Sequence, residues 1–367
     1  MEALWVIPCR PASGPGRASL TLTSLHNVLE GIQIRPRSVY IIGVQARIGE
    51  FMFKGFANVW TPLVLASKLG RAPLRVILAG EPVVLFRGKD GAIGALIDRC
   101  PHRGIALSLG RVCEDGHLEC AFHGWRFDTS GANMFVPLNP DARRDRLGAT
   151  ALPARQVGDM IWVHTSPGAE APCEPIAPDG LTAPGLVRTY IERQWACHWT
   201  RAMENMLDSP HLPFVHRRTI GRPLIRRMGP NSRMDVTWAD TPNGGRAQAS
   251  LDGEGSQAFL EFFRPNMMAL NIPIPGKHLR IHALVIPAGE GRTRLIVAGS
   301  RDFARLPLLN PWFSWLNGKI ADEDKAVVES SGHQETPPAV AEHSVATDRA
   351  TLQFRKYYYD TLRDQHA

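Results

Sequence analysis

The sequence predicts an α+β protein in which a small antiparallel β-domain precedes a second domain of antiparallel sheet and helices. The first observation is a series of short β-branched runs separated by glycine-containing turns, at 74–79, 82–87, 93–97 and 157–163. The second is a strand-like alternation with turns over 233–303, and the third is an amphipathic helical stretch over 311–331. A length of 367 residues is enough for two such domains.

Composition divides the chain further. Residues 1–51 are rich in arginine and poor in acidic residues. We expect them to form an N-terminal extension that is disordered or that precedes the true start at Met52. A transit peptide and an ordered extra element remain open alternatives. The first domain is expected over 52–166, a linker rich in Pro, Ala and Gly over 167–186, and the second domain over 187–367.

The overall charge and the cysteines narrow the class of protein. A net charge of +7 with dispersed arginines suits an acidic partner or an anionic substrate better than nucleic acid. No apolar run approaches the roughly 18 residues of a membrane span. Six cysteines lie far apart in a chain too long to need disulfide staples, which indicates a reducing, cytoplasmic compartment with some cysteines binding metal.

Two short stretches of the first domain each combine a cysteine with a histidine. Cys100 and His102 stand in Cys-Pro-His-Arg-Gly, and Cys120 and His123 stand in Cys-Ala-Phe-His-Gly-Trp. The glycine that follows each pair lets the backbone pass close to a bulky inorganic core. Zinc fingers group cysteine with cysteine and histidine with histidine. The mixture seen here favours a Rieske [2Fe–2S] centre, with one all-cysteine iron and one all-histidine iron, over zinc.

A second set of candidate ligands lies between Arg201 and His216. Its polar members are Asn205, Asp208, His211 and His216. Two imidazoles and one carboxylate, with other positions open, hold a non-haem Fe(II) that must meet O2. The histidines are five residues apart and prolines interrupt the helix between them, unlike the i, i+4 pair of zinc proteases. A purely structural role is the alternative, and the ligand cluster upstream favours iron.

The third iron ligand is expected on the C-terminal helix. An apolar stripe recurs there every four residues, at Leu316, Ile320, Asp324 and Val328. A carboxylate in such a stripe is costly unless it is paired or bound to metal, so Asp324 is the preferred ligand and Glu323 the alternative. The charged neighbours off this stripe are expected to be solvated, namely Asp322, Glu323 and Lys325.

Together these motifs resemble those of the α subunits of Rieske non-haem iron oxygenases. The likeness covers roughly residues 52–360. It implies that Cys100 and Cys120 bind one cluster iron, and that His102 and His123 bind the other. It also implies mononuclear-iron ligands, which are His211, His216 and Asp324. The family's bridging carboxylate and its usual asparagine, both expected to serve catalysis, fall on Asp208 and Asn205.

The resemblance implies a Rieske domain followed by a helix-grip, START-like catalytic domain, with a [2Fe–2S] cluster and Fe(2+) as cofactors. The implied reaction is hydroxylation or oxidative demethylation of an apolar, aromatic or polycyclic small molecule by O2. A homotrimer is implied, in which Asp208 links His211 to His123 of the partner subunit. The sequence has no dinucleotide-binding glycine motif and no further cysteine cluster. Electrons are therefore expected from a separate NAD(P)H-dependent reductase, with or without a ferredoxin.

Two further questions stay open at this point. Five arginines follow His216 and form either a solvated face or a dock for an acidic electron donor or a substrate carboxylate, at 217, 218, 222, 226 and 227. A non-catalytic electron carrier, or a small-molecule binding protein with a vestigial iron site, is the alternative function. Iron content separates these classes, since a carrier needs about two irons per chain and an oxygenase about three.

Overall fold

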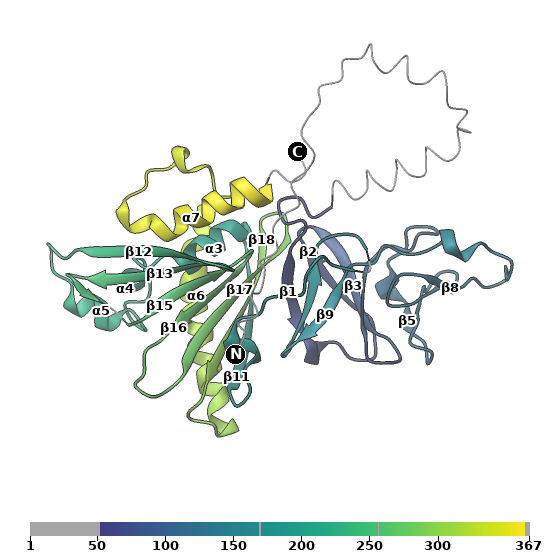
Figure 1. The fold of residues 1–367 in the computed structure, drawn as a ribbon, viewed down its shortest axis with the longest axis horizontal. Helices are drawn as coiled ribbons and strands as arrows, with labels where there is room; N and C mark the ends of the chain where they lie inside the picture. Colours follow the sequence, from purple (N-terminus) through teal and green to yellow (C-terminus); the bar gives the residue numbers. More distant parts are fainter. Residues whose placement is uncertain (1–51, 169, 256, 364–367) are drawn as a thin grey trace, which may run out of the picture. The chain divides into compact units, whose positions relative to one another are not determined.

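The computed structural model describes residues 52–168, 170–255 and 257–363. The chain divides into two compact units, Met1–Met52 and Phe53–Ala367. All helices and strands named below belong to the second unit (Figure 1). The predicted N-terminal extension, residues 1–51, lies outside the described residues.

The first β-domain is built from strands β1 to β10. They form three antiparallel sheets in the orders β1-β10-β9, β2-β3-β4 and β5-β6-β7-β8. The strands are β1 (Trp60–Leu65), β2 (Leu74–Leu78), β3 (Glu81–Arg87), β4 (Ile93–Ile97), β5 (Arg111–Val112), β6 (Leu118–Glu119), β7 (Arg126–Phe127), β8 (Asn133–Phe135), β9 (Ala154–Val157) and β10 (Met160–His164). The three predicted β-branched strands are confirmed as β2, β3 and β4.

The predicted strand over 157–163 is confirmed from Met160 onward as β10, but its start is wrong, because a turn separates Val157, the end of β9, from β10. Gly158 has a φ of +58°, in the left-handed region that favours glycine. The chain reverses there, and β10 pairs antiparallel with β9 on one side and with β1 on the other.

The second domain is built on an eight-stranded antiparallel sheet. Its order is β11-β18-β17-β16-β15-β13-β12, with β14 paired to β13. The strands are β11 (Val187–Trp195), β12 (Met234–Thr241), β13 (Gly244–Leu251), β14 (Glu254–Gly255), β15 (Phe259–Phe263), β16 (Met267–Asn271), β17 (Leu279–Gly289) and β18 (Arg292–Arg301). The predicted strand-like alternation over 233–303 is confirmed. Gly289 pairs with Arg292, so Glu290 and Gly291 make the turn between β17 and β18.

Helices cover this sheet and carry the candidate iron ligands. They are α2 (Asp179–Thr182), α3 (Trp199–Leu207), α4 (Leu212–Val215), α5 (Arg222–Arg227), α6 (Asn310–Val328) and α7 (Arg349–Tyr357). Single-turn 3₁₀ helices lie at Ala66–Lys68, Leu107–Leu109, Arg144–Arg146, Pro307–Leu309, Glu329–Ser331, Ala339–Ala341 and Ala346–Asp348, and a π-helix at Tyr358–Arg363. α6 packs against β11 and β18, and α3 packs against β16 and β17. The predicted α+β class is confirmed, with a β-domain followed by an antiparallel sheet with helices.

The buried line of α6 differs from the predicted stripe. It runs through Asn317, Ala321, Asp324 and Val328, whereas Leu316 and Ile320 are only half-buried. Each residue of an α-helix advances by about 100°, so a strict four-residue repeat drifts by about 40° at every step. Steps of four and three must therefore alternate to keep one face inward, and Asp324 lies on both lines.

Within the second unit, β1 holds the first β-domain to the large sheet. The Nδ2 of Asn266 donates to Thr61 Oγ1 at 2.9 Å, and both residues are fully buried. Nearby, the ring of Phe56 meets that of Trp199 edge-on, with centroids 5.2 Å apart. The start of the first domain therefore packs directly beside α3.

The structure bears on two expectations from the sequence, the absence of a membrane span and the state of the cysteines. In the part of the chain that is described, no helix is both long enough and apolar enough to cross a lipid bilayer. Four of the described cysteines are free thiols, Cys100, Cys113, Cys120 and Cys197. Cys173 is disulfide-bonded, which the expectation of a chain without disulfides did not include.

Candidate metal centres

The two cysteine–histidine turns of the first domain share one backbone geometry. In each, the cysteine N–H donates to the carbonyl five residues later, Cys100 to Ile105 and Cys120 to Trp125, both at 2.8 Å. The glycine N–H four residues after each cysteine donates back to the cysteine carbonyl, at 2.9 and 3.0 Å. Gly104 and Gly124 have φ values of +73° and +68°, as tight turns of this kind require.

These turns bring thiol to thiol and imidazole to imidazole. Cys100 and Cys120 lie in the apolar core of the domain, and burial raises the pKa of the Cys100 thiol to about 11. A bound metal would hold it as a thiolate. The rings of His102 and His123 have centroids 4.6 Å apart, and His102 stacks on Trp125. His102 Nδ1 is buried without a hydrogen-bond partner, as expected of an atom reserved for a ligand.

The spread of these four side chains argues against a single zinc ion. Thiolates and imidazoles around one Zn2+ lie about 2.0–2.3 Å from it, so any two ligand atoms are at most about 4.6 Å apart. Among the described residues, three or more ligand-type atoms of His, Cys, Asp or Glu lie within 4.8 Å of one another at one place only. None of these four side chains belongs to it. The four residues therefore fit a larger group with two metal atoms.

That place is formed by His211, His216 and Asp324. The Nε2 atoms of the two histidines lie 3.5 and 3.0 Å from the same atom, Asp324 Oδ1. Asp324 Oδ1 is buried and has no hydrogen-bond partner. Only 1% of the His216 side chain and 6% of the Asp324 side chain are exposed. A buried carboxylate that faces two imidazoles fits a divalent cation.

The local fold explains how residues five apart can converge. α3 ends at Leu207, and Asp208 has an extended backbone with φ of −84° and ψ of 125°. His211 then precedes the single turn of α4, and His216 follows it. The prolines break the helix as predicted, and the two rings meet at 67° with centroids 5.2 Å apart. Asp324 reaches the same point from α6.

The other nitrogen of each imidazole faces a carboxylate. His211 Nδ1 lies 3.4 Å from Asp208 Oδ2, a contact whose angles do not make a hydrogen bond. His216 Nδ1 lies 2.9 Å from Glu323 Oε2 and does make one. Burial lowers the pKa of His216, but the carboxylates of Asp324 and Glu323 outweigh it and raise the pKa above its ordinary value.

The expectation that Glu323 is solvated is therefore wrong. Its side chain is 20% exposed and turned toward His216, while Asp322 is 51% exposed and pairs with Arg193 at 2.7 Å. Glu323 lies about 100° around the helix from Asp324, and its longer side chain covers that offset. The acidic Asp322-Glu-Asp324 run was the only signal in the sequence, and it did not say which acids turn inward.

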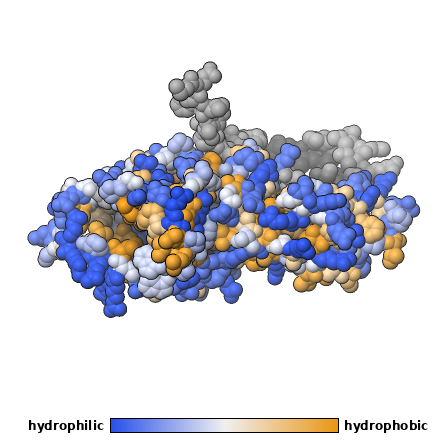
Figure 2. Space-filling view, turned by 90° about the horizontal axis from the view of Figure 1, so that it is seen from below, coloured by the Kyte–Doolittle hydropathy of each residue, from blue (hydrophilic) through white to orange (hydrophobic). Residues whose placement is uncertain are grey.

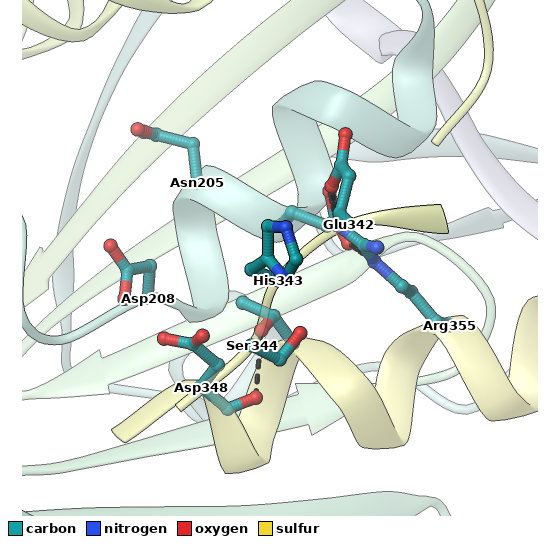
Figure 3. A pocket seen from close by; sticks show the side chains of 9 residues that line it. Asn205, Asp208, Glu342, His343, Ser344, Asp348 and Arg355 are labelled. Carbon is teal, nitrogen blue, oxygen red and sulfur yellow. Dashed lines mark hydrogen bonds and ion pairs between the residues drawn. The ribbon is translucent and has the colours of Figure 1, made fainter. Parts of the chain in front are cut away.

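Asn205 and Asp208 lie at the C-terminal end of α3 and line a pocket of about 240 Å³. Its other walls come from the segment before α7 and from α7 itself (Figure 3). One guanidinium, that of Arg355, lines the pocket against four carboxylates, so the pocket is acidic on balance; the carboxylates are Glu204, Asp208, Glu342 and Asp348. The sequence did not predict these tail residues as neighbours of Asp208, because the contact depends on the tail folding back onto α3.

A buried ion network fastens that tail to α3. Arg355 donates from Nε and Nη2 to the Glu204 carboxylate, and from Nη2 to Glu342 at 2.6 Å. Thr336 Oγ1 also donates to Glu204, at 3.0 Å. The side chains of Glu204 and Arg355 are 11% and 10% exposed, so each is the main counter-charge of the other in a buried setting.

Replacing Arg355 by methionine should lower the free energy of unfolding by about 3–5 kcal/mol. The change removes the guanidinium that hydrogen-bonds to the buried Glu204 and leaves only Arg201, at 3.8 Å, as a counter-charge. Urea-induced unfolding of both proteins at one pH measures this. The matched control is Arg363→Met, whose partner Glu335 lies at 3.0 Å in a pair that is 42% and 34% exposed. This control should cost about 0–1 kcal/mol. Equal losses in the two variants would contradict a special role for the buried pair.

Comparison with known proteins follows the same division of the chain. Residues 59–145 match the Rieske [2Fe-2S] domain, and residues 195–363 match the vanillate O-demethylase oxygenase C-terminal domain. The chain is 30% identical to chlorophyllide a oxygenase of Chlamydomonas reinhardtii over 75% of its own length and 43% of that protein. It is 25% identical to the methylxanthine N3-demethylase NdmB of Pseudomonas putida, over 80% and 84%.

Solved structures show the same fold. That of NdmB superposes with a TM-score of 0.70 at 25% identity, over 84% of this chain and 94% of that one. Dicamba monooxygenase bound to dicamba superposes with a TM-score of 0.69 at 22% identity, over 83% and 96%. The chain spans about half the length, or less, of the first curated relatives it matches.

The matches and the two sets of ligand-type residues define an iron–sulfur protein with a second, mononuclear metal site. The chain belongs to the α-subunit family of Rieske non-haem iron oxygenases. Membership implies two cofactors, a [2Fe–2S] cluster and a catalytic Fe(2+).

Proposed function

We propose that this chain is the terminal oxygenase of a multicomponent system. It takes electrons from a separate NAD(P)H-dependent reductase, directly or through a ferredoxin. With O2 it hydroxylates or oxidatively demethylates an apolar, aromatic or polycyclic small molecule. The names of a methylxanthine demethylase and a chlorophyllide oxygenase among its relatives support this substrate class.

One observation carries the proposal. Two imidazole nitrogens and one carboxylate oxygen converge at a single buried point, with no fourth protein ligand among the described residues. Such a triad occupies one side of a metal and leaves positions open for O2, whereas a structural zinc site is closed by four ligands. An electron carrier would need no such point.

The proposed roles follow from where each residue lies. When bound, the cluster supplies electrons and the mononuclear Fe(II) activates O2 beside the substrate. Cys100, Cys120, His102 and His123 would hold the cluster, and His211, His216 and Asp324 would hold Fe(II). Asp208 lies behind His211, 3.4 Å from Nδ1, where it would link this ligand to the partner subunit. Burial of His216 and Asp324 keeps bulk water from this side of the site.

The homotrimer belongs to the same proposal. In Figure 1 strands β5 and β8 lie at the opposite end of the second unit from α4 and α5. They belong to the sheet whose strands β6 and β7 flank the second cluster turn. The cluster of a partner subunit would then serve this chain's iron, with Asp208 lying between His211 and His123 of the partner subunit. The acidic pocket at Asp208 is the proposed docking place.

The surface around the cluster turns has the complementary chemistry. Arg103 of the first turn and Arg99 just before it are exposed, and the same domain exposes further arginines at 143, 144 and 146. Phe122 and Leu138 are exposed to 59% and 104%. Apolar patches are visible over the right-hand end of the molecule in Figure 2, the end that carries β5 and β8 in Figure 1. A basic and apolar surface at this end of the first β-domain complements the charge of the acidic pocket at Asp208.

The electron donor and the compartment complete the proposal. The arginines at 217, 218, 222, 226 and 227 are exposed on and around α4 and α5, which supports docking of an acidic donor there. A cytoplasmic location stays a prediction from the sequence.

Iron analysis and isotope labelling test the function. The purified chain should be brown and hold about three irons, and with a reductase it should insert ¹⁸O from ¹⁸O2 into a member of an aromatic, polycyclic and N- or O-methyl panel. For a demethylation, the labelled oxygen leaves with the one-carbon product, so formaldehyde is also analysed. A chain with about two irons that never consumes O2 would instead be an electron carrier.

A further inference from the structure

We propose that Glu323 is a positioning residue for His216, which holds one ring nitrogen so that the other can bind metal. The inference rests on the proposed function, since it assumes a metal at His211, His216 and Asp324. It adds a residue of this chain that lies behind the ligand His216 and not among the three ligand atoms.

The hydrogen bond between Glu323 and His216 selects the tautomer of the imidazole. A carboxylate accepts hydrogen bonds and does not donate them, so the 2.9 Å contact with Oε2 places the proton on His216 Nδ1. When a metal is bound, Nε2 is then the nitrogen that gives its lone pair, and this atom lies 3.0 Å from the second ligand atom, Asp324 Oδ1. The ring is therefore set for metal binding through the nitrogen that points at the other ligands.

Glu323 is itself held in place. Thr219 Oγ1 donates to the same oxygen, Glu323 Oε2, at 2.6 Å. The Thr219 N–H donates to the His216 carbonyl at 2.9 Å, so the turn after α4 bends back on the residue it supports. Because Asp324 is the next residue of α6, one rigid helix sets both the ligand and the residue that orients its partner ligand.

The two histidines are supported unequally. Asp208 lies 3.4 Å from His211 Nδ1 without a hydrogen bond, and its side chain is 28% exposed. Glu323 is committed to His216, which is 1% exposed. Retention of the metal should thus depend on Glu323, while Asp208 stays free to contact a further group. The two carboxylates are not equivalent supports.

Metal affinity tests this inference without a turnover assay. The assembled protein, with its cluster in place, is freed of mononuclear iron and titrated with Co(II) in competition with a chelator. Glu323→Ala should bind Co(II) about 10- to 100-fold more weakly than the wild type, as is usual when a carboxylate behind a metal-bound histidine is lost. Glu323→Gln should stay within a few-fold of the wild type, because its amide oxygen still accepts from Nδ1.

The matched control is Asp322→Ala, which removes the preceding carboxylate of the same helix. Asp322 pairs with Arg193 and faces away from His216, so Co(II) affinity should not change. The Co(II) ligand-field spectrum should change in Glu323→Ala and keep its form in the control. Should Glu323→Ala be insoluble, Thr219→Val takes its place, with a smaller loss of affinity in the same direction.

The outcomes separate the inference from the function on which it rests. A wild-type chain that takes up no Co(II) at a site lost in Asp324→Ala would overturn the proposed function. A wild type that binds normally, with Glu323→Ala equal to it, would overturn only the role of Glu323. The role of Glu323 would also be overturned if Asp322→Ala lost as much Co(II) affinity, or if Glu323→Gln bound Co(II) as weakly as Glu323→Ala. Where Thr219→Val replaces an insoluble Glu323→Ala, an unchanged Co(II) affinity in that variant would have the same meaning.

Discussion

Replacing Asp324 by alanine should lower the iron content from about three to about two per chain and abolish oxygenation, while the cluster spectrum stays intact. Asp324 Oδ1 is the one atom that faces the Nε2 of both His211 and His216. Without it, two imidazoles remain as ligands, and the neutral pair holds Fe(II) poorly. Iron analysis with visible and low-temperature EPR spectra of the reduced protein measures both parts of the prediction.

The reciprocal variant makes this a double dissociation. Cys100→Ser should lose the brown absorbance of the cluster and keep a mononuclear site that binds one Fe(II) or Co(II). The two centres share no ligand, and Cys100 belongs to the core of the first β-domain. If Asp324→Ala also lost its cluster, or if it kept about three irons, the assignment of Asp324 as ligand would be wrong.

Replacing Asp208 by asparagine should separate metal binding from turnover. The isosteric amide leaves both sets of metal ligands in place, so iron content, oligomeric state and reduction of the cluster by the donor should stay near wild type. The single turnover of pre-reduced protein with substrate and O2 should slow by about 100-fold, the upper range for loss of a carboxylate behind a metal-bound histidine. Stopped-flow absorbance and chemical quench follow the two events.

The control for Asp208 comes from the same pocket. Asp348 is a second carboxylate in its wall, and its side chain caps the turn at Val345. Asp348→Asn changes the charge of the pocket by the same amount, yet Asp348 does not lie beside a metal ligand. It should leave the single turnover within a few-fold of wild type. Equal slowing in both variants would point to pocket charge, and normal turnover in Asp208→Asn would contradict its bridging role.

Features with a short sequence range were predictable. Strands β2 to β4 follow from β-branched runs between glycine turns, and the alternation of cysteine with histidine pointed to a cluster of two metals. His211 and His216 are five residues apart, a spacing that places them on no regular helix face. They were predicted as iron ligands from the chemistry of imidazole and the nearby carboxylate. Asp324 was predictable because a carboxylate on an apolar helix face is costly without a partner.

Features that depend on distant segments were not predictable in this way. Glu323 meets His216, which lies 107 residues earlier in the chain, and no local pattern tells a solvated acid from one that reaches such a partner. The acidic wall at Glu342 and Asp348 exists because the tail folds back on α3. The exact rotation of α6 and the length of the Glu323 side chain decide the first contact, and hydrophobic periodicity reports neither. The second depends on Arg355 reaching Glu204, which lies 151 residues earlier in the chain.

The clasp between Arg355 and Glu204 has a consequence for inherited or engineered changes at the end of the chain. Glu204 lies one helical turn before Asp208, so the last helix braces the residue that borders the iron ligands. A premature stop before residue 349 would remove helix α7, and with it Arg355, which binds Glu204, and Thr351, which lines the pocket. None of the proposed metal ligands would be lost. Genetic lesions in the tail should therefore resemble lesions of the active centre.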